Sequence, residues 1–132
     1  MLNRQSMPQS PDAPGRMEGM VPGVKAGGFL FLSAIRGRDP KTDKMPSDPL
    51  EQARQALRNI EAVLAGSGAT LKHVVKVTLY LHDLEKRHQF HQAWMEFFPT
   101  DPPARIAVGV ADANVSRGGN AHYALDVIAL AP

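Results

Sequence analysis

An arginine stands at the point where a pair of prolines gives way to a predicted strand. The stretch DPPARIAVGV covers residues 101–110 and places Pro102 and Pro103 shortly before Arg105. Proline fixes the backbone and cannot enter a sheet interior, whereas the apolar alternation that follows is typical of a strand. A guanidinium is always charged, and its planar fork of donors matches a carboxylate. Arg105 is therefore suited to anchoring a small acid; the alternative is a surface charge at a strand end.

Other residue types that carry chemistry form weaker patterns. His88 and His91 have a helical spacing that could place both on one side, as in a zinc site, but no third ligand follows at a recognisable spacing. We favour an exposed His88 and a buried His91. Ser33 lacks a Gly-x-Ser-x-Gly elbow, and the glycines of GSGAT follow a helix instead of preceding one. We therefore expect no metal, no serine nucleophile and no nucleotide site.

The composition is typical of one small domain. Of the 132 residues, 43% are hydrophobic, which is enough for one modest core, and the lack of cysteine fits a reducing cytoplasm. The net charge is +2 and the basic residues are scattered, so we expect no nucleic-acid partner. The N-terminus lacks the apolar core of a signal peptide, and no run of about 18 apolar residues could span a membrane. We expect a cytoplasmic protein without a membrane partner.

The N-terminal half of the chain predicts a tail, a hairpin and a helix. Residues 1–19 are polar and lack periodicity, so we expect a flexible tail ahead of a single domain over residues 20–132. The dipeptide Gly27-Gly28 separates two apolar runs and accepts the positive φ angles of a tight hairpin. Asp48 then caps an amphipathic helix that ends near Gly66.

The C-terminal half predicts two strands around a second helix, and then a closing strand. Residues 74–81 alternate as a strand, with one covered face made of Val75, Val77, Leu79 and Leu81. A helix follows, with His91 and Trp94 on its apolar stripe, and Pro99 ends it. The strand after Arg105 comes next, and the closing strand, NAHYALDVIALA, places His122, Ala124 and Asp126 on one face. This order indicates an α+β fold with both helices on one face of a sheet.

These segments resemble the Rid or YjgF family, the reactive intermediate deaminases, which hydrolyse enamine and imine intermediates to a ketone and ammonia. The similarity runs from about Gly23 to Leu130. It rests on GFLFLSAIRG, DPLEQARQALRNIEAVLAGSGATLKHVVKVTLYLHDL, FHQAWMEFF, PPAR and ALDVIAL. The resemblance implies a chorismate-mutase-like α+β fold with a mixed sheet, a homotrimer with clefts at its subunit interfaces, and neither a metal nor an organic cofactor.

The resemblance also assigns substrate-binding residues. Arg105 matches the arginine that binds the substrate carboxylate, and the backbone N–H of Ala107 matches its helper. Ser33 matches a serine that lines the pocket. Met20 stands where the best-known deaminase branch has a tyrosine, a change that would make the pocket more apolar and adaptable.

Two further positions depart from that branch. His91 replaces an asparagine, and Ala124 replaces a glutamate that positions the attacking water. Alanine can neither orient a water nor exchange a proton. His122 and Asp126 lie two residues to either side of Ala124, so His122 or His91 is a candidate proton shuttle. The alternatives are that His91 packs in the core, that Asp126 pairs with a neighbouring cation, and that His122 has no function.

Three functions remain open from the sequence. The leading hypothesis is hydrolytic deamination of small enamine or imine acids, with Arg105 binding the carboxylate and without a covalent nucleophile. A second is a pathway-specific deaminase of a larger unsaturated amino acid. The third is a non-catalytic trimer that binds small carboxylates or acts as a chaperone-like particle, and the loss of the glutamate at Ala124 favours it.

Overall fold

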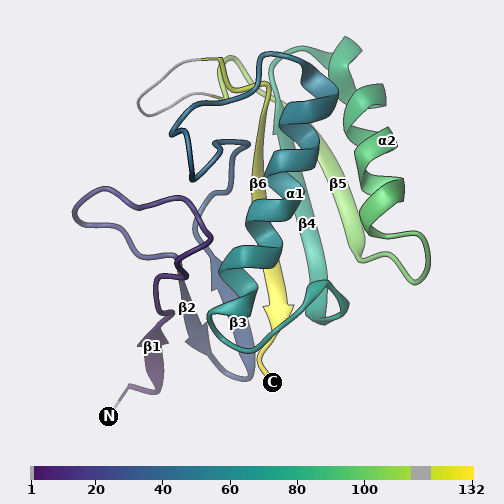
Figure 1. The fold of residues 1–132 in the computed structure, drawn as a ribbon. Helices are drawn as coiled ribbons and strands as arrows, with labels where there is room; N and C mark the ends of the chain where they lie inside the picture. Colours follow the sequence, from purple (N-terminus) through teal and green to yellow (C-terminus); the bar gives the residue numbers. More distant parts are fainter. Residues whose placement is uncertain (1, 114–119) are drawn as a thin grey trace.

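The computed structural model describes residues 2–113 and 120–132, which form a six-stranded sheet and two α-helices (Figure 1). The strands are β1 (Arg4–Ser6), β2 (Gly23–Ala26), β3 (Phe29–Leu32), β4 (Val74–Leu81), β5 (Ala104–Gly109) and β6 (Tyr123–Leu130). The helices are α1 (Pro49–Ala65) and α2 (Arg87–Phe97), with short 3-10 turns at Leu71–His73 and Leu84–Lys86. The predicted α+β class is confirmed.

The sheet is mixed and has the order β1-β2-β3-β6-β4-β5. Neighbouring strands are antiparallel except β4 and β5, which are parallel and joined through α2. A parallel pair needs such a crossover, because a tight turn can join only antiparallel strands. Strand β5 is therefore an edge of the sheet, and it lies beside α2 in the sequence and in space (Figure 1).

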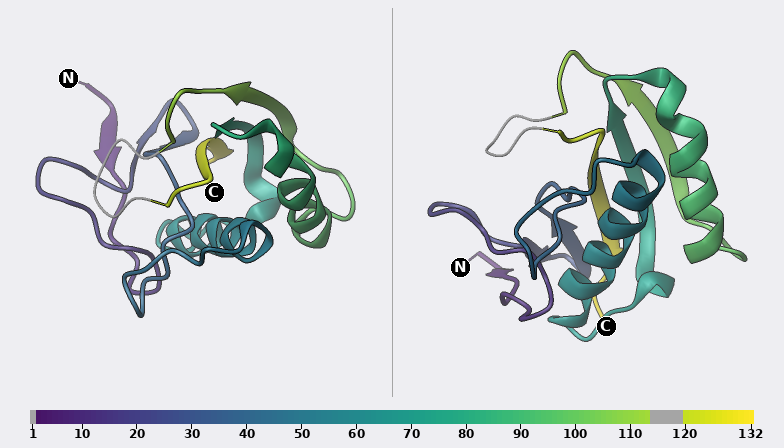
Figure 2. Two further views of the ribbon diagram at one scale, coloured as in Figure 1. Left: turned by 90° about the horizontal axis from the view of Figure 1, so that it is seen from above. Right: turned by 45° about the horizontal axis from the view of Figure 1, so that its top comes forward.

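Both helices pack on one face of the sheet, as predicted (Figure 2). The core between them is made of alternate strand residues and the inner faces of the helices, and it includes Leu30, Leu57, Ile60, Leu79, Phe90 and Leu125. The opposite face has no helix over it and exposes apolar side chains at Phe29, Phe31, Ile106 and Leu130.

None of the helices in the described part of the chain is long and apolar enough to cross a membrane.

Local signals placed the hairpin and the first helix correctly. Gly27 and Gly28 both have positive φ angles, 58° and 82°, and join β2 to β3. The Asp48 side chain accepts a hydrogen bond from the backbone N–H of Glu51, 3.0 Å away, and so caps α1. A capped N-terminus with proline in the first turn explains why the helix begins at this point.

The N-terminal segment is not the unstructured tail that its composition suggested. Residues Arg4–Ser6 form β1 on the free edge of β2, and Met7 and Ala13 are buried. Strand pairing at an edge uses backbone groups, so it does not require an apolar pattern in the added strand. Composition alone could not reveal this contact.

Two strand predictions need correction. A register shift between Val74 and Lys76 places Val74 in the core and leaves Val75 41% exposed, because a bulge reverses the alternation at that point. The closing strand begins at Tyr123, so His122 lies just outside it. Part of the loop before this strand, residues 114–119, lies outside the described residues.

Candidate functional site

Arg105 lies near the start of the edge strand β5, opposite Val77 of β4. Val77 is a core residue on the helix side of the sheet, so the register directs Arg105 toward α2. Its guanidinium carbon lies 4.7 Å from the centre of the Trp94 ring. Pro102 and Pro103 immediately precede the strand and fix where it begins.

Trp94 gives the guanidinium a rigid platform. Its side chain is only 3% exposed, and its ring centre lies 4.5 Å from that of Phe98 and 6.1 Å from that of Phe90. A cation over an indole face is attracted by the negative charge density of the ring. Because the ring is locked in the core, Arg105 is positioned before any ligand arrives. The sequence placed Trp94 on the apolar stripe of the helix but did not identify this role.

His91 is exposed, which makes the prediction of a buried histidine wrong. It lies one turn before Trp94 on α2, and its Nδ1 is 3.1 Å from Nη2 of Arg105. A guanidinium can only donate, so Nδ1 is the acceptor. The proton of the neutral imidazole is then on Nε2, which is left to donate to a ligand. His88 is also exposed, as predicted.

Among the described residues no carboxylate lies within salt-bridge distance of Arg105. Partial burial lowers the pKa of Arg105, but a guanidinium stays charged at every physiological pH. The charge is thus held by an aromatic ring and an imidazole, and neither neutralises it. Such a cation at an exposed strand end can bind the carboxylate of a small molecule.

Ser33 and Met20 lie together, but away from Arg105. The Ser33 hydroxyl donates to the carbonyl of Val21 at 2.6 Å, which ties the end of β3 to the segment that contains Met20. Met20 is 46% exposed and lines a cavity. In the sheet, β6 and β4 separate β3 from β5, so one chain does not bring Ser33 or Met20 to Arg105. Ala107 is exposed on β5, two residues beyond Arg105.

Ala124 does not reach the surface of the single chain. It is 6% exposed and packs with Ala113 and Ala121. Asp126 is exposed on the helix-free face of the sheet, opposite Thr78, and it forms no salt bridge to any described residue. Ala124 and Asp126 are two residues apart on β6 and therefore lie on the same face of the sheet, where Ala124 is covered and Asp126 is exposed.

His122 is held by contacts at the end of the sheet. Its Nε2 lies 2.9 Å from the carbonyl of Ser47, and its Nδ1 lies 3.5 Å from the ammonium group of Lys86. A carbonyl accepts and an ammonium donates, so the first nitrogen carries the proton and the second accepts. Both ring nitrogens are engaged within the chain, which argues against the predicted proton shuttle. His122 also stacks loosely on His82. Among the described residues there is no group of three side chains that could bind a metal ion.

Known proteins share both the sequence pattern and the fold. The family model described as Endoribonuclease L-PSP matches residues 10–119. A RutC family protein of Pyrococcus horikoshii is 40% identical over 67% of this chain and 71% of its own length. A 2-iminobutanoate/2-iminopropanoate deaminase of Dermatophagoides farinae is 34% identical over 67% of this chain and 70% of its own length.

The fold is also similar to solved structures. The crystal structure of E. coli TdcF with bound serine superposes with a TM-score of 0.86 and 26% identity, covering 96% of this chain and 98% of that one. The family model matches residues 10–119 of the 132-residue chain, and the structural match with TdcF covers 96% of it. Together with the Pro-Ala-Arg motif and the geometry around Arg105, these similarities show that the chain belongs to the YjgF/Rid family.

Proposed function

We propose that this protein hydrolyses small enamine or imine acids to 2-keto acids and ammonia, in clefts between the subunits of a homotrimer. The single observation that carries the proposal is Arg105, a cation positioned by Trp94 and His91 without a carboxylate partner in the described chain. The names of two relatives support it: one is an iminobutanoate and iminopropanoate deaminase, and another was crystallised with serine, an amino acid whose carboxylate Arg105 could bind.

The reaction needs water, a bound carboxylate and proton transfers. Water adds its oxygen to the carbon of the C=N bond, the π electrons move to nitrogen, and nitrogen takes up a proton. The water oxygen loses one proton to give a carbinolamine, whose amino group takes up a second proton. Its C–N bond then breaks and ammonia leaves, while the hydroxyl loses its proton and forms C=O. An imine carbon is already electrophilic, so positioning of the acid by Arg105 supplies much of the acceleration. No covalent nucleophile is required.

The geometry supports a specific part for His91 in the proposed reaction. Because Nδ1 accepts from Arg105, the neutral ring presents Nε2–H and donates a hydrogen bond. In this tautomer His91 can stabilise the carbinolamine or orient the imine, but it cannot take a proton from water. The attacking water would then be deprotonated by bulk solvent or by the leaving nitrogen.

Assembly into a trimer would bring the separated site residues together. The helix-free face of the sheet exposes Phe29, Phe31, Ile106 and Leu130, which is an apolar surface that a subunit contact would cover. Within one chain, strands β6 and β4 separate the region of Ser33 and Met20 from Arg105 on β5. A cleft between subunits would join β5 of one copy to the Ser33 region of the next.

A second candidate function is supported by Ala124. Its burial against Ala113 and Ala121 leaves no polar group at the position where the family's deaminases orient water. A trimer that binds small carboxylates without turnover is compatible with this arrangement, as is a deaminase specific for a larger unsaturated amino acid. The two classes are separated by incubating the protein with an imino acid generated in solution and measuring ammonia. Release above the spontaneous rate supports hydrolysis, whereas saturable binding without release supports the binding function.

A further inference from the structure

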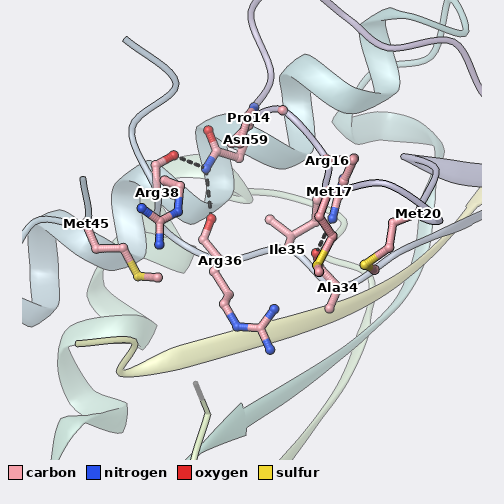
Figure 3. Close-up of a pocket in the computed structure, with 11 residues that line it drawn as sticks. Pro14, Arg16, Met17, Met20, Ala34, Ile35, Arg36, Arg38, Met45 and Asn59 are labelled. Carbon is pink, nitrogen blue, oxygen red and sulfur yellow. Dashed lines mark hydrogen bonds between the residues drawn. The ribbon is translucent and has the colours of Figure 1, made fainter. Parts of the chain in front are cut away.

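A cavity of about 300 Å³ lies beside α1, between the segment that precedes β2 and the segment that follows β3 (Figure 3). Its wall combines thioethers with guanidinium groups: Met17, Met20, Met45, Arg16, Arg36 and Arg38. No acidic residue is among the described residues that line it. Pockets that hold small molecules start at about this volume. The cavity therefore has room for a small ligand and a wall that is both apolar and cationic.

The backbone that carries these arginines is fixed by a buried amide. Asn59 of α1 is 1% exposed, and its Nδ2 donates to the carbonyls of Arg36 and Arg38, each 2.8 Å away (Figure 3). Between them, Gly37 packs so closely on α1 that a Cβ there would overlap the backbone carbonyl of Gln52. The segment cannot move away from the helix without losing these contacts, so the arginines are presented in a fixed arrangement.

The guanidinium groups are also held individually. Nη1 of Arg16 donates to the carbonyl of Ala34 at 2.9 Å, and Nε of Arg36 donates to the carbonyl of Ala113 at 2.8 Å. Each of these bonds uses one of the five donors of a guanidinium. The remaining donors of Arg16 and Arg36 form no salt bridge with the described part of the chain.

The charge in this region is incompletely compensated. Burial and the neighbouring charge of Arg36 both lower the pKa of Arg16, so the two cations repel each other in a partly dry environment. Nε of Arg16 is buried and donates no hydrogen bond to any described residue. Among the described residues, Asp112 partly offsets the charge of Arg36 without forming a salt bridge to it, and the Asp43 carboxylate lies 3.8 Å from Arg38. A bound anion would relieve this repulsion.

We propose that the cavity binds a small organic oxyanion, with Arg16 and Arg36 on the phosphate or carboxylate group and the methionine side chains on a short apolar body. Thioethers are flexible and pack well against an apolar or aromatic ring. The cavity shares Met20 with the predicted substrate cleft, while Arg105 of the same chain is on the far edge of the sheet. Arg16 and Arg36 are thus cations additional to the carboxylate anchor of the proposed deaminase, and in the proposed trimer they would lie beside its cleft.

The test is calorimetric titration of the protein with phenyl phosphate and with phenylacetate, which separates the two kinds of oxyanion. Binding of at least one is expected, and it should weaken with added salt because both arginines contribute charge. Arg16→Gln and Arg36→Gln should each weaken it by about tenfold or more, as expected for the loss of a charged hydrogen-bonding group. Arg58→Gln is the matched control, because Arg58 is exposed on α1 away from the cavity.

Three results would overturn the proposal. They are the lack of binding of either compound at millimolar concentration, equal weakening by Arg58→Gln, and binding that is unchanged in Arg16→Gln. Arg36→Gln removes the hydrogen bond to Ala113, so its melting temperature is measured alongside. Where that variant is unstable, Arg16→Gln decides the question. The outcome is independent of ammonia release, so failure of this site and failure of the proposed activity are distinguishable.

Discussion

Nη2 of Arg105 lies 3.1 Å from Nδ1 of His91, and the same guanidinium lies over the ring of Trp94. His91 and Trp94 are on one face of α2, while Arg105 is on the neighbouring edge strand. Helix α2 thus positions the charged group of β5 from two sides, with one aromatic and one polar contact. This arrangement explains how an exposed arginine can be rigid enough to orient a substrate.

Replacing the platform should weaken substrate binding. Trp94→Leu removes the ring under Arg105, and because a cation–π contact contributes about 0.5–2 kcal/mol, KM for the imino acid should rise about two- to thirtyfold. Trp94→Phe keeps an aromatic face and should show a smaller rise. Phe98→Leu is the control, since it disturbs the same aromatic cluster but not the contact with Arg105. Steady-state kinetics and melting temperatures check this, and an equal KM change in Phe98→Leu would contradict a specific role for Trp94.

The tautomer of His91 can be measured directly. The contact with Arg105 predicts that the neutral imidazole is protonated at Nε2 and not at Nδ1. Nitrogen-15 NMR of the neutral imidazole distinguishes the two forms. In Arg105→Ala the fraction of the ring protonated at Nε2 should fall to that of a free histidine side chain. A proton on Nδ1 in the wild type would show that His91 is free to act as a base, and the role proposed above would be wrong.

Sequence periodicity predicted the two helices, the first hairpin and the strand after Arg105, because each depends on local signals. The position of Asp48 and the pair Gly27-Gly28 are examples, and the structure confirms both. The burial of His91 was predicted wrongly, because the apolar stripe of α2 is narrow and His91 lies at its margin, where Arg105 approaches. Contacts that depend on pairing between distant segments, such as β1 with β2, leave no pattern in the sequence.

The site was only partly predictable for the same reason. The Pro-Ala-Arg motif identified Arg105 from its neighbours in the chain, but Trp94 meets it only after α2 crosses back over the sheet. The cavity wall of Arg16 and Arg36 also depends on tertiary structure, since Asn59 joins a helix to a loop more than twenty residues earlier. The sequence order of these residues contains no periodic signal.

Gln52 is expected to be the most important buried polar residue for stability. It is fully buried on α1, where its amide nitrogen donates to the carbonyls of Pro46 and Asn120 and its oxygen accepts from the backbone of His122. Gln52→Ala leaves these backbone groups without partners, so the free energy of unfolding should fall by about 2–4 kcal/mol. Gln55→Ala, one turn further along and half-buried, should change it by less than about 1 kcal/mol. Urea denaturation measures both, and equal effects would contradict the prediction.

Tyr123 should make the fold sensitive to alkali. Burial, with repulsion from Asp48 and Asp83, raises the pKa of its phenol, which donates to the carbonyl of Lys86 at 2.6 Å. Below the unfolded-state pKa of about 10 both states keep the proton, so Tyr123 causes no pH dependence. Above it the unfolded state ionises more readily, and the free energy of unfolding should fall as pH rises. Thermal melting from about pH 8 to about pH 11, a range that spans the ionisation of a phenol, tests this. In Tyr123→Phe, whose ring cannot ionise, the melting temperature should fall less over this range.

The central claim is that Arg105 anchors the carboxylate of an imine that the protein hydrolyses. The most direct test measures ammonia and 2-keto acid release from an imino acid generated in solution, with the wild type, Arg105→Lys and Arg105→Ala. We predict acceleration by the wild type, a loss of about tenfold or more in kcat/KM for Arg105→Lys, which keeps the charge but not the planar fork, and a larger loss for Arg105→Ala. Acceleration that is unchanged in Arg105→Ala, or a wild-type rate equal to the spontaneous one, would contradict the account.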